Sequence, residues 1–208
     1  LDSTDIDKFV LENQFGRAVM EKKDEGWKML EPVKYPGNNE LIGTIIKNIA
    51  DAKKLSIISS NPEKYGLFGV DSGKAAELYV YENDKMHAHL FIGRVGTSRR
   101  ENYVRLAGDE NVYLVLSRMS LLRNTNIPEF RDKNMLNITK DEIKKIHYQY
   151  KDEEFTLALK DTTWMIGGQE VDQIEAGTTA EDIAGMQTDF FRDEPPKDDV
   201  EFDLVITV

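Results

Sequence analysis

Two histidines, His87 and His89, stand two residues apart in a stretch typical of a β-strand. Residues at this spacing share one face of a strand, so two imidazoles could begin a zinc site. A catalytic zinc needs a third ligand and outer groups that orient the ligands, and the only other histidine, His147, is distant in the sequence. An exposed strand face explains the pair better. We therefore predict no metal site and no cofactor.

A glycine-bearing loop with three arginines is the second candidate, and it reads G-R-V-G-T-S-R-R over residues 93–100. Backbone N–H groups and guanidinium groups can hold a phosphate, sulfate or carboxylate. The loop lacks the lysine and the spacing of a P-loop and joins two predicted strands, so an ordinary exposed loop is the competing interpretation. A ligand or partner bound here would contact Arg94, Arg99, Arg100 and the nearby Tyr103.

Carboxylate runs such as Asp152-Glu153-Glu154 and Asp198-Asp199 could supply acid–base chemistry, but charge runs are usually solvated faces. The chain contains no G-x-S-x-G, H-E-x-x-H or dinucleotide motif. We therefore predict a protein that is not an enzyme. A hydrolase that uses dispersed carboxylates is kept as an alternative, because such sites leave no local motif.

Composition limits the classes of protein that remain. The 208 residues include 27 basic and 38 acidic residues, which gives a net charge of −11 and argues against a nucleic-acid partner. The absence of cysteine excludes disulfides and thiol catalysis. No apolar run approaches the roughly 20 residues of a membrane helix. The chain begins at Leu1 and stops within an alternating apolar pattern, so we expect that a preceding segment has been removed.

The elements that must position these residues include an internal repeat. Residues 6–27 align without a gap with residues 143–164, and each stretch reads as two strands followed by a tryptophan that opens a third. A period this long predicts two related lobes. Trp27 and Trp164 could be sugar platforms, but their equivalent places favour a core role in both lobes. The aligned pairs are Ile6 and Ile143, Phe9 and Ile146, Ala18 and Phe155, Met20 and Leu157, and Trp27 and Trp164.

Each lobe is predicted to continue with an amphipathic helix and a closing strand. In the first, a helix capped at Asn38 or Asn39 ends near Lys54, and an apolar strand follows over residues 55–59. In the second, the pattern Thr178-Thr-Ala-Glu181 predicts a capping box, with an apolar stripe from Ala180 to Phe190. Pro195-Pro196 then ends the helix, and residues 200–208 alternate as a strand, in the place that residues 76–80 take in the first lobe.

The first lobe also carries an insertion, residues 76–116, with two predicted β-hairpins and one or two helical turns after it. The hairpin strands are expected at residues 77–81 and 87–92, and at 103–106 and 112–116. Residues Phe130, Arg131, Asp132 and Lys133 are predicted to tie the lobe junction through ion pairs. The predicted fold is α+β, with two related lobes over residues 1–126 and 127–208. Each lobe is an antiparallel sheet of three strands, one amphipathic helix and a closing strand.

These landmarks, in this order, resemble a bacterial family of unknown function, the domain-of-unknown-function family 4340. The resemblance rests on Gly26-Trp27, the helix from Asn38, and Tyr65-Gly66-Leu67. It continues through Leu90-Phe-Ile-Gly93, Asn102-Tyr-Val-Arg105, Val112-Tyr113, Phe130-Arg-Asp-Lys133 and Trp164. The family's Tyr-Gly-Leu element usually leads into a proline-containing turn, and here Phe68-Gly69-Val70-Asp71 stands in that place.

The resemblance implies an extracytoplasmic domain, tethered to the membrane by an N-terminal segment that this chain lacks. It implies protein partners in an ABC-type export complex or a gliding-type complex, and it assigns no catalytic residues. The leading hypothesis is therefore a non-enzymatic interaction domain that serves such a complex. The alternative is a ligand-binding module for an anionic glycan or peptide, which would use the arginine loop.

Overall fold

A computed structural model describes residues 2–194 and 202–208, and the chain divides into two compact units. Unit 1 is Leu1–Asp132 and unit 2 is Lys133–Val208, so residues 127–132 fall in the first unit. Each unit is built on one mostly antiparallel sheet with few helices, which confirms the predicted α+β class.

The sheet of unit 1 has nine strands in the order β4-β3-β2-β1-β6-β7-β8-β9-β5. Strands β1, β2 and β3 form an antiparallel meander, and β6 pairs with the side of β1 that β2 leaves open. The strands are β1 (Lys8–Asn13), β2 (Gly16–Lys23), β3 (Gly26–Glu31), β4 (Tyr35–Pro36), β5 (Lys53–Ser59), β6 (Ala76–Glu82), β7 (Lys85–Val95), β8 (Glu101–Leu106) and β9 (Val112–Leu116).

The main core of unit 1 lies between one face of this sheet and two helices, α1 (Asn39–Ala50) and α3 (Ser120–Asn124). Alternate residues of the strands, such as Phe9 and Leu11, point into it, and α1 buries a stripe of isoleucines spaced three and four residues apart. The opposite face of β6–β9 is partly covered by α2 (Tyr65–Phe68), the short 3₁₀ helix η1 (Pro62–Lys64) and the loop after them.

Helix α1 begins where it was predicted and ends earlier than predicted. The side chain of Asn38 accepts a hydrogen bond from the N–H of Leu41 and caps the first turn. The helix stops at Ala50 and not near Lys54, because Lys53 and Lys54 already pair with strand β9. The strand expected over residues 55–59 therefore starts two residues earlier, as β5.

Both predicted hairpins of the insertion are present, as β6–β7 and β8–β9. The first turns at Asn83 and Asp84, whose positive φ values of 49° and 60° suit a two-residue turn. The predicted helical turns after the insertion correspond to α3. A 3₁₀ helix, η2 (Ile127–Phe130), ends the unit.

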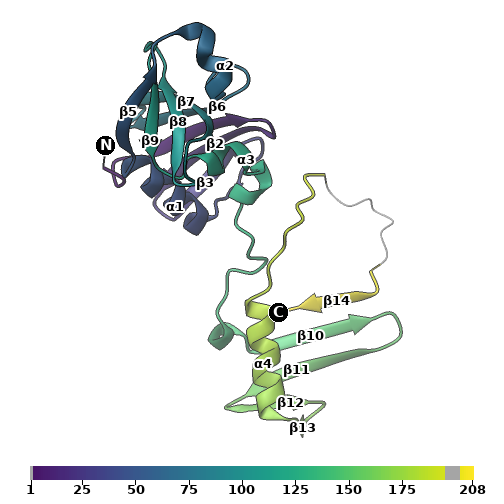
Figure 1. Cartoon of the computed structure of the whole chain (residues 1–208). Helices are drawn as coiled ribbons and strands as arrows, with labels where there is room; N and C mark the ends of the chain where they lie inside the picture. Colours follow the sequence, from purple (N-terminus) through teal and green to yellow (C-terminus); the bar gives the residue numbers. More distant parts are fainter. Residues whose placement is uncertain (1, 195–201) are drawn as a thin grey trace. The chain divides into compact units, whose positions relative to one another are not determined.

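The sheet of unit 2 has five strands in the order β13-β12-β11-β10-β14, and α4 lies across one face of it (Figure 1). Its core contains Ile143, Ile146, Leu157, Trp164 and Ile183. The elements are η3 (Lys140–Glu142), β10 (Lys145–Tyr150), β11 (Glu154–Lys160), β12 (Thr163–Ile166), β13 (Gln169–Glu170), α4 (Gln173–Ala184) and β14 (Leu204–Thr207).

The predicted start of the second helix was wrong. Helix α4 is capped by Asp172, whose carboxylate accepts the N–H groups of Ile174 and Glu175. Thr178 therefore lies inside the helix, where its hydroxyl donates to a carbonyl one turn earlier. The predicted stripe also ran too far, because the helix ends at Ala184, before Met186 and Phe190.

Some predicted features lie outside the described residues. These are the helix-breaking Pro195-Pro196, the carboxylates Asp198-Asp199, and Val200 at the start of the predicted closing strand. The described part of that strand is β14, and it pairs antiparallel with β10.

Candidate functional site

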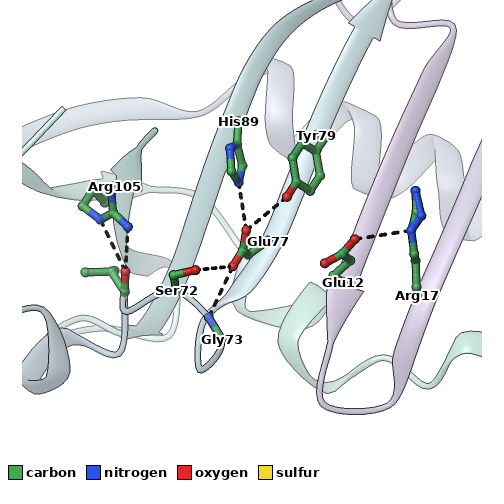
Figure 2. Close-up of polar contacts among 9 residues, drawn as sticks. Glu12, Arg17, Ser72, Gly73, Glu77, Tyr79, His89 and Arg105 are labelled. Carbon is green, nitrogen blue, oxygen red and sulfur yellow. Dashed lines mark hydrogen bonds and ion pairs between the residues drawn. The ribbon is translucent and has the colours of Figure 1, made fainter. Parts of the chain in front are cut away.

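A network of polar side chains in unit 1 lies on the outer face of the sheet and centres on Glu77 (Figure 2). Glu77 on β6 stands directly opposite Glu12 on β1 and Phe91 on β7, so one row of side chains crosses the sheet. At one end of this row Arg17 binds Glu12 over 3.3 Å. At the other end the guanidinium of Arg105 lies 3.8 Å from the ring centre of Phe91.

The carboxylate of Glu77 accepts four hydrogen bonds. The hydroxyl of Ser72 (3.2 Å) and the N–H of Gly73 (3.3 Å) donate to one oxygen. The hydroxyl of Tyr79 donates to the other over 3.2 Å, and Nε2 of His89 lies 3.0 Å from it. Two donors come from the loop before β6 and two from strands, so Glu77 fastens that loop to the sheet.

These contacts set the protonation of the group. Burial raises the pKa of Glu77, but the hydrogen bonds from His89, Gly73, Tyr79 and Ser72 outweigh burial and leave it below the ordinary value of 4.5. Burial, and then the charge of Glu77, raise the pKa of Tyr79. Glu77 is therefore a saturated anion at neutral pH, which suits an anchor better than a group that must gain and lose a proton.

A depression of about 410 Å³ adjoins this network. It is lined by Glu12, Asn13, Gln14, Gly73, Lys74, Ala75 and Glu77. Acidic side chains and Lys74 share the lining, so the depression shows no single charge preference.

The two histidines of the predicted strand do not act as a pair. A β-bulge in β7 sets His87 off the regular register, and His87 instead binds Glu82 across the hairpin. His89 stacks on Tyr79, with ring centres 4.1 Å apart. Within the described residues, no group of three or more His, Asp or Glu side chains is placed to hold a metal ion.

Of the four residues predicted to bind a ligand, Arg100 lines a depression to which the other three do not contribute. Arg94 is exposed on β7 and packs against Gly69 beside Arg123, while the ring of Tyr103 lies 4.9 Å from that of Phe68. Arg99 is exposed in the loop. Arg100 lines a different depression, of about 310 Å³, together with Asn48, Asp51, Leu116, Ser117 and Arg118.

The structure adds Arg123 to this set, since its guanidinium donates to the carbonyls of Gly69 (3.2 Å) and Ile92 (3.4 Å). Burial lowers the pKa of Arg123, and the positive charge of Arg94 lowers it further. Arg123 lies on α3, distant in sequence from the loop, so no local motif could have joined it to Arg94.

Trp27 and Trp164 are each buried in the core of their own unit. In both units the backbone N–H of the tryptophan donates to a side-chain amide at the first residue of the covering helix. The acceptors are Asn39 of α1, at 2.8 Å, and Gln173 of α4, at 2.7 Å. These amides link strand and helix.

The residues predicted at the lobe junction fall on both sides of the unit boundary. Phe130 is fully buried in the core of unit 1, where its ring lies 6.0 Å from that of Phe9. Arg131 is buried and lies 5.8 Å from the ring of Tyr35, and the N–H of Asp132 donates to Pro36. Lys133 belongs to unit 2 and binds Asp189 over 2.7 Å.

The carboxylate run at residues 152–154 lies in and beside the turn of the β10–β11 hairpin and is exposed. Its one ion pair among the described residues joins Glu154 to His147, at 3.7 Å. This run therefore does not line any of the depressions described above.

Like Glu77 and Arg123, an exposed apolar patch on β5, an edge strand of the nine-stranded sheet, was not predicted from the sequence. Leu55, Ile57 and Ile58 are 49%, 53% and 40% exposed. Apolar composition predicted the strand correctly, but only its place at the edge decides that these side chains face solvent. Single exposed apolar residues are ordinary, whereas three within four consecutive residues of an edge strand make that strand a candidate interaction surface.

A family model described as a domain of unknown function (DUF4340) matches residues 27–204. The chain belongs to this family. The resemblance noted from the sequence is thereby confirmed, and the DUF4340 match runs through both units. Searches of curated proteins and of solved structures found no match. In the described part of this DUF4340 chain, no helix is long and apolar enough to cross a membrane.

Proposed function

We propose that this chain is a non-enzymatic protein-interaction domain that contacts its partner through the β5 patch, defined as Leu55, Ile57 and Ile58. The exposure of all three side chains on one edge strand carries this proposal. If a partner covered these three side chains, each Å² of apolar surface removed from water would contribute about 25 cal/mol to the free energy of binding.

The patch favours side-chain contact over the addition of a further strand. The pairing of β5 with β9 is irregular at two places, between Lys54 and Ser56 and between Ile57 and Ser59. Bulges and edge lysines both discourage main-chain pairing, and β5 begins with Lys53 and Lys54. A complementary partner surface would present apolar side chains to the β5 patch and carboxylates to Lys53 and Lys54.

The setting that we propose is extracytoplasmic, with the domain tethered to the membrane by a segment outside this chain. The partner would be a membrane subunit of an ABC-type export or gliding-type complex. This part of the proposal rests on the family resemblance, and the net charge of −11 agrees with it, since an acidic domain is not attracted to anionic lipid surfaces.

Photo-crosslinking in the native membrane tests this proposal. A photo-crosslinking amino acid at Ile57 of the full-length protein should capture a membrane subunit of such a complex, identified by mass spectrometry. The same amino acid at Phe15, 48% exposed in a turn of the same unit, is the matched control. Leu55→Glu should reduce the Ile57 crosslink at least fivefold. Equal capture from both positions, or capture only of cytoplasmic proteins, would refute the proposal.

We also propose that the two units arose by duplication of one architecture. In each, a meander is followed by a 12-residue helix and a strand that pairs antiparallel with the first strand of the meander. The strand orders β4-β3-β2-β1-β6 and β13-β12-β11-β10-β14 correspond position by position. The tryptophan-to-amide hydrogen bond also occurs in both. On this proposal β6 is the closing strand of the first copy, and strands β5, β7, β8 and β9 belong to that copy alone.

A second candidate function is the binding of an anionic glycan or peptide, and the pair Arg94 and Arg123 favours it. Two guanidinium groups near each other repel, and an anion between them would relieve that repulsion. Replacing Arg94, Arg99 and Arg100 by alanine should abolish binding of a glycan or peptide found in a screen. The melting temperature should stay unchanged. Binding that survived the triple substitution would exclude this site.

A further inference from the structure

Helices α1 and α4 have the same length but present different side chains to their sheets. At the fourth, seventh and eighth positions α1 carries Ile42, Ile45 and Ile46, all buried. The same positions of α4 are Ala176, Thr179 and Ala180. The two changes from isoleucine to alanine each remove three heavy atoms from the space between helix and sheet, and the change to threonine removes one.

The sheet of unit 2 does not refill all of this space. A groove of about 430 Å³ runs between α4 and strands β10, β11 and β12. Its floor includes Tyr148 and Phe155, which are cross-strand partners with ring centres 4.8 Å apart, and both are only partly buried. The lining residues are Tyr148, Phe155, Leu157, Ile166, Val171, Asp172, Glu175, Ala176 and Thr179.

The charged residues of the lining are both acidic. Asp172 is occupied as the cap of α4, whereas the carboxylate of Glu175 makes no ion pair or side-chain hydrogen bond with any residue that the structure describes. The net charge of unit 2 is also negative. Residues 133–208 contain 8 basic and 18 acidic residues, a net charge of −10, which leaves −1 of the total −11 for residues 1–132.

We infer that this groove binds a small organic cation with an apolar body, an alkyl- or arylammonium. The apolar body would lie against the aromatic and aliphatic floor, and the ammonium group would face Glu175. Ligand sites of this kind are concave, mostly apolar and hold few polar groups, and aromatic faces attract cations. Charge complementarity selects this occupant over a neutral or anionic one. The inference is independent of the β5 patch, which lies on the other unit.

Three probes of equal chain length separate the contributions of charge and apolar surface. Amide chemical shifts of the isotope-labelled full chain are followed by NMR during titration with hexylammonium, 1-hexanol and hexanoate. Hexylammonium should shift the amides of groove residues at the lowest concentration, with 1-hexanol at least fivefold weaker and hexanoate without effect. Equal affinity for hexylammonium and 1-hexanol would refute the charge assignment, and the absence of groove shifts with hexylammonium would refute the site.

Two sets of variants locate the binding. Glu175→Gln should bring hexylammonium to the affinity of 1-hexanol, while Asp182→Asn, two turns along the same helix and outside the lining, should change nothing. Ala176→Ile with Thr179→Ile restores the α1 side chains and should abolish binding of both probes. Circular dichroism checks that this double variant folds, and if it does not, Glu175→Gln still decides. Concentration-dependent groove shifts without a probe would show that a second copy occupies the groove and would overturn the inference.

Discussion

Replacement of Glu77 by glutamine should destabilise unit 1 selectively. The substitution keeps the size of the side chain but removes its charge. One carboxylate oxygen, which accepts hydrogen bonds, becomes an NH₂ group, which can only donate and therefore faces other donors. Glu77 accepts four hydrogen bonds between 3.0 and 3.3 Å, and its side chain is only 14% exposed. The network therefore cannot be rebuilt with water at every donor.

The size of the effect follows from the environment of the four donors. Ser72 and Gly73 are near solvent, so water can replace their bonds at little cost. The bonds to Tyr79 and His89 are part-buried, and hydrogen bonds to charged groups contribute about 1.5–3 kcal/mol each before partial compensation by the amide. We expect a loss of about 2 kcal/mol, which would lower the melting temperature of a unit of this size by roughly 6–8 °C.

The assay is urea unfolding followed by the fluorescence of Trp27, in a Trp164→Phe background so that the signal reports unit 1 alone. Glu12→Gln is the matched control. It removes a neighbouring carboxylate on the same face, which is 45% exposed and paired with Arg17, and such surface pairs contribute about 0–1 kcal/mol.

The pH dependence has a definite sign. Because the folded state lowers the pKa of Glu77, its stabilising contribution is complete above 4.5 and is lost as the pH falls through the folded-state pKa. The difference in stability between wild type and Glu77→Gln should therefore narrow as the pH falls below 4.5. A difference no larger than that of Glu12→Gln at pH 7, or one that does not narrow in acid, would refute the reasoning.

Three further substitutions test other parts of the structure. Gly43→Ala should raise the stability of unit 1 by about 0.5–1 kcal/mol, because an added Cβ in this helix interior meets nothing within 4 Å. Gly93→Ala should lower the stability of unit 1 by about 2 kcal/mol or more, because its Cβ would overlap the backbone carbonyl of Phe68; a neutral result in urea unfolding would contradict this packing. Asn39→Ala should lower the stability of unit 1 by about 1 kcal/mol, and Gln173→Ala should lower that of unit 2 by the same amount. Urea unfolding should show the first effect only in the fluorescence of Trp27 and the second only in that of Trp164. A single substitution that shifted both unfolding curves would contradict the assignment of each amide to its own unit.

Sequence patterns located those elements whose signals are local. Alternation marked both hairpins of the insertion, and the isoleucine stripe after Asn38 marked α1, because one buried face imposes its period directly on the residues. The same reasoning failed at α4, where small residues weaken the stripe and an internal threonine pattern resembled a cap. Asp172 was equally available as a cap, and a stronger apolar stripe after it would have identified it.

The sequence by itself determined the positions of most strands, which depend on residue types within a short window. The order of such landmarks along the chain determined the α+β class and the membership of the family. The tertiary structure alone decided which residues became neighbours. It set Glu77 opposite Glu12, brought Arg123 beside Arg94, and put β5 at an edge where its apolar side chains remain exposed. Strand order is a property of long-range pairing, and two residues on adjacent strands carry no local signal of their contact. The candidate sites depend on those contacts, and for that reason they emerge only in the folded chain.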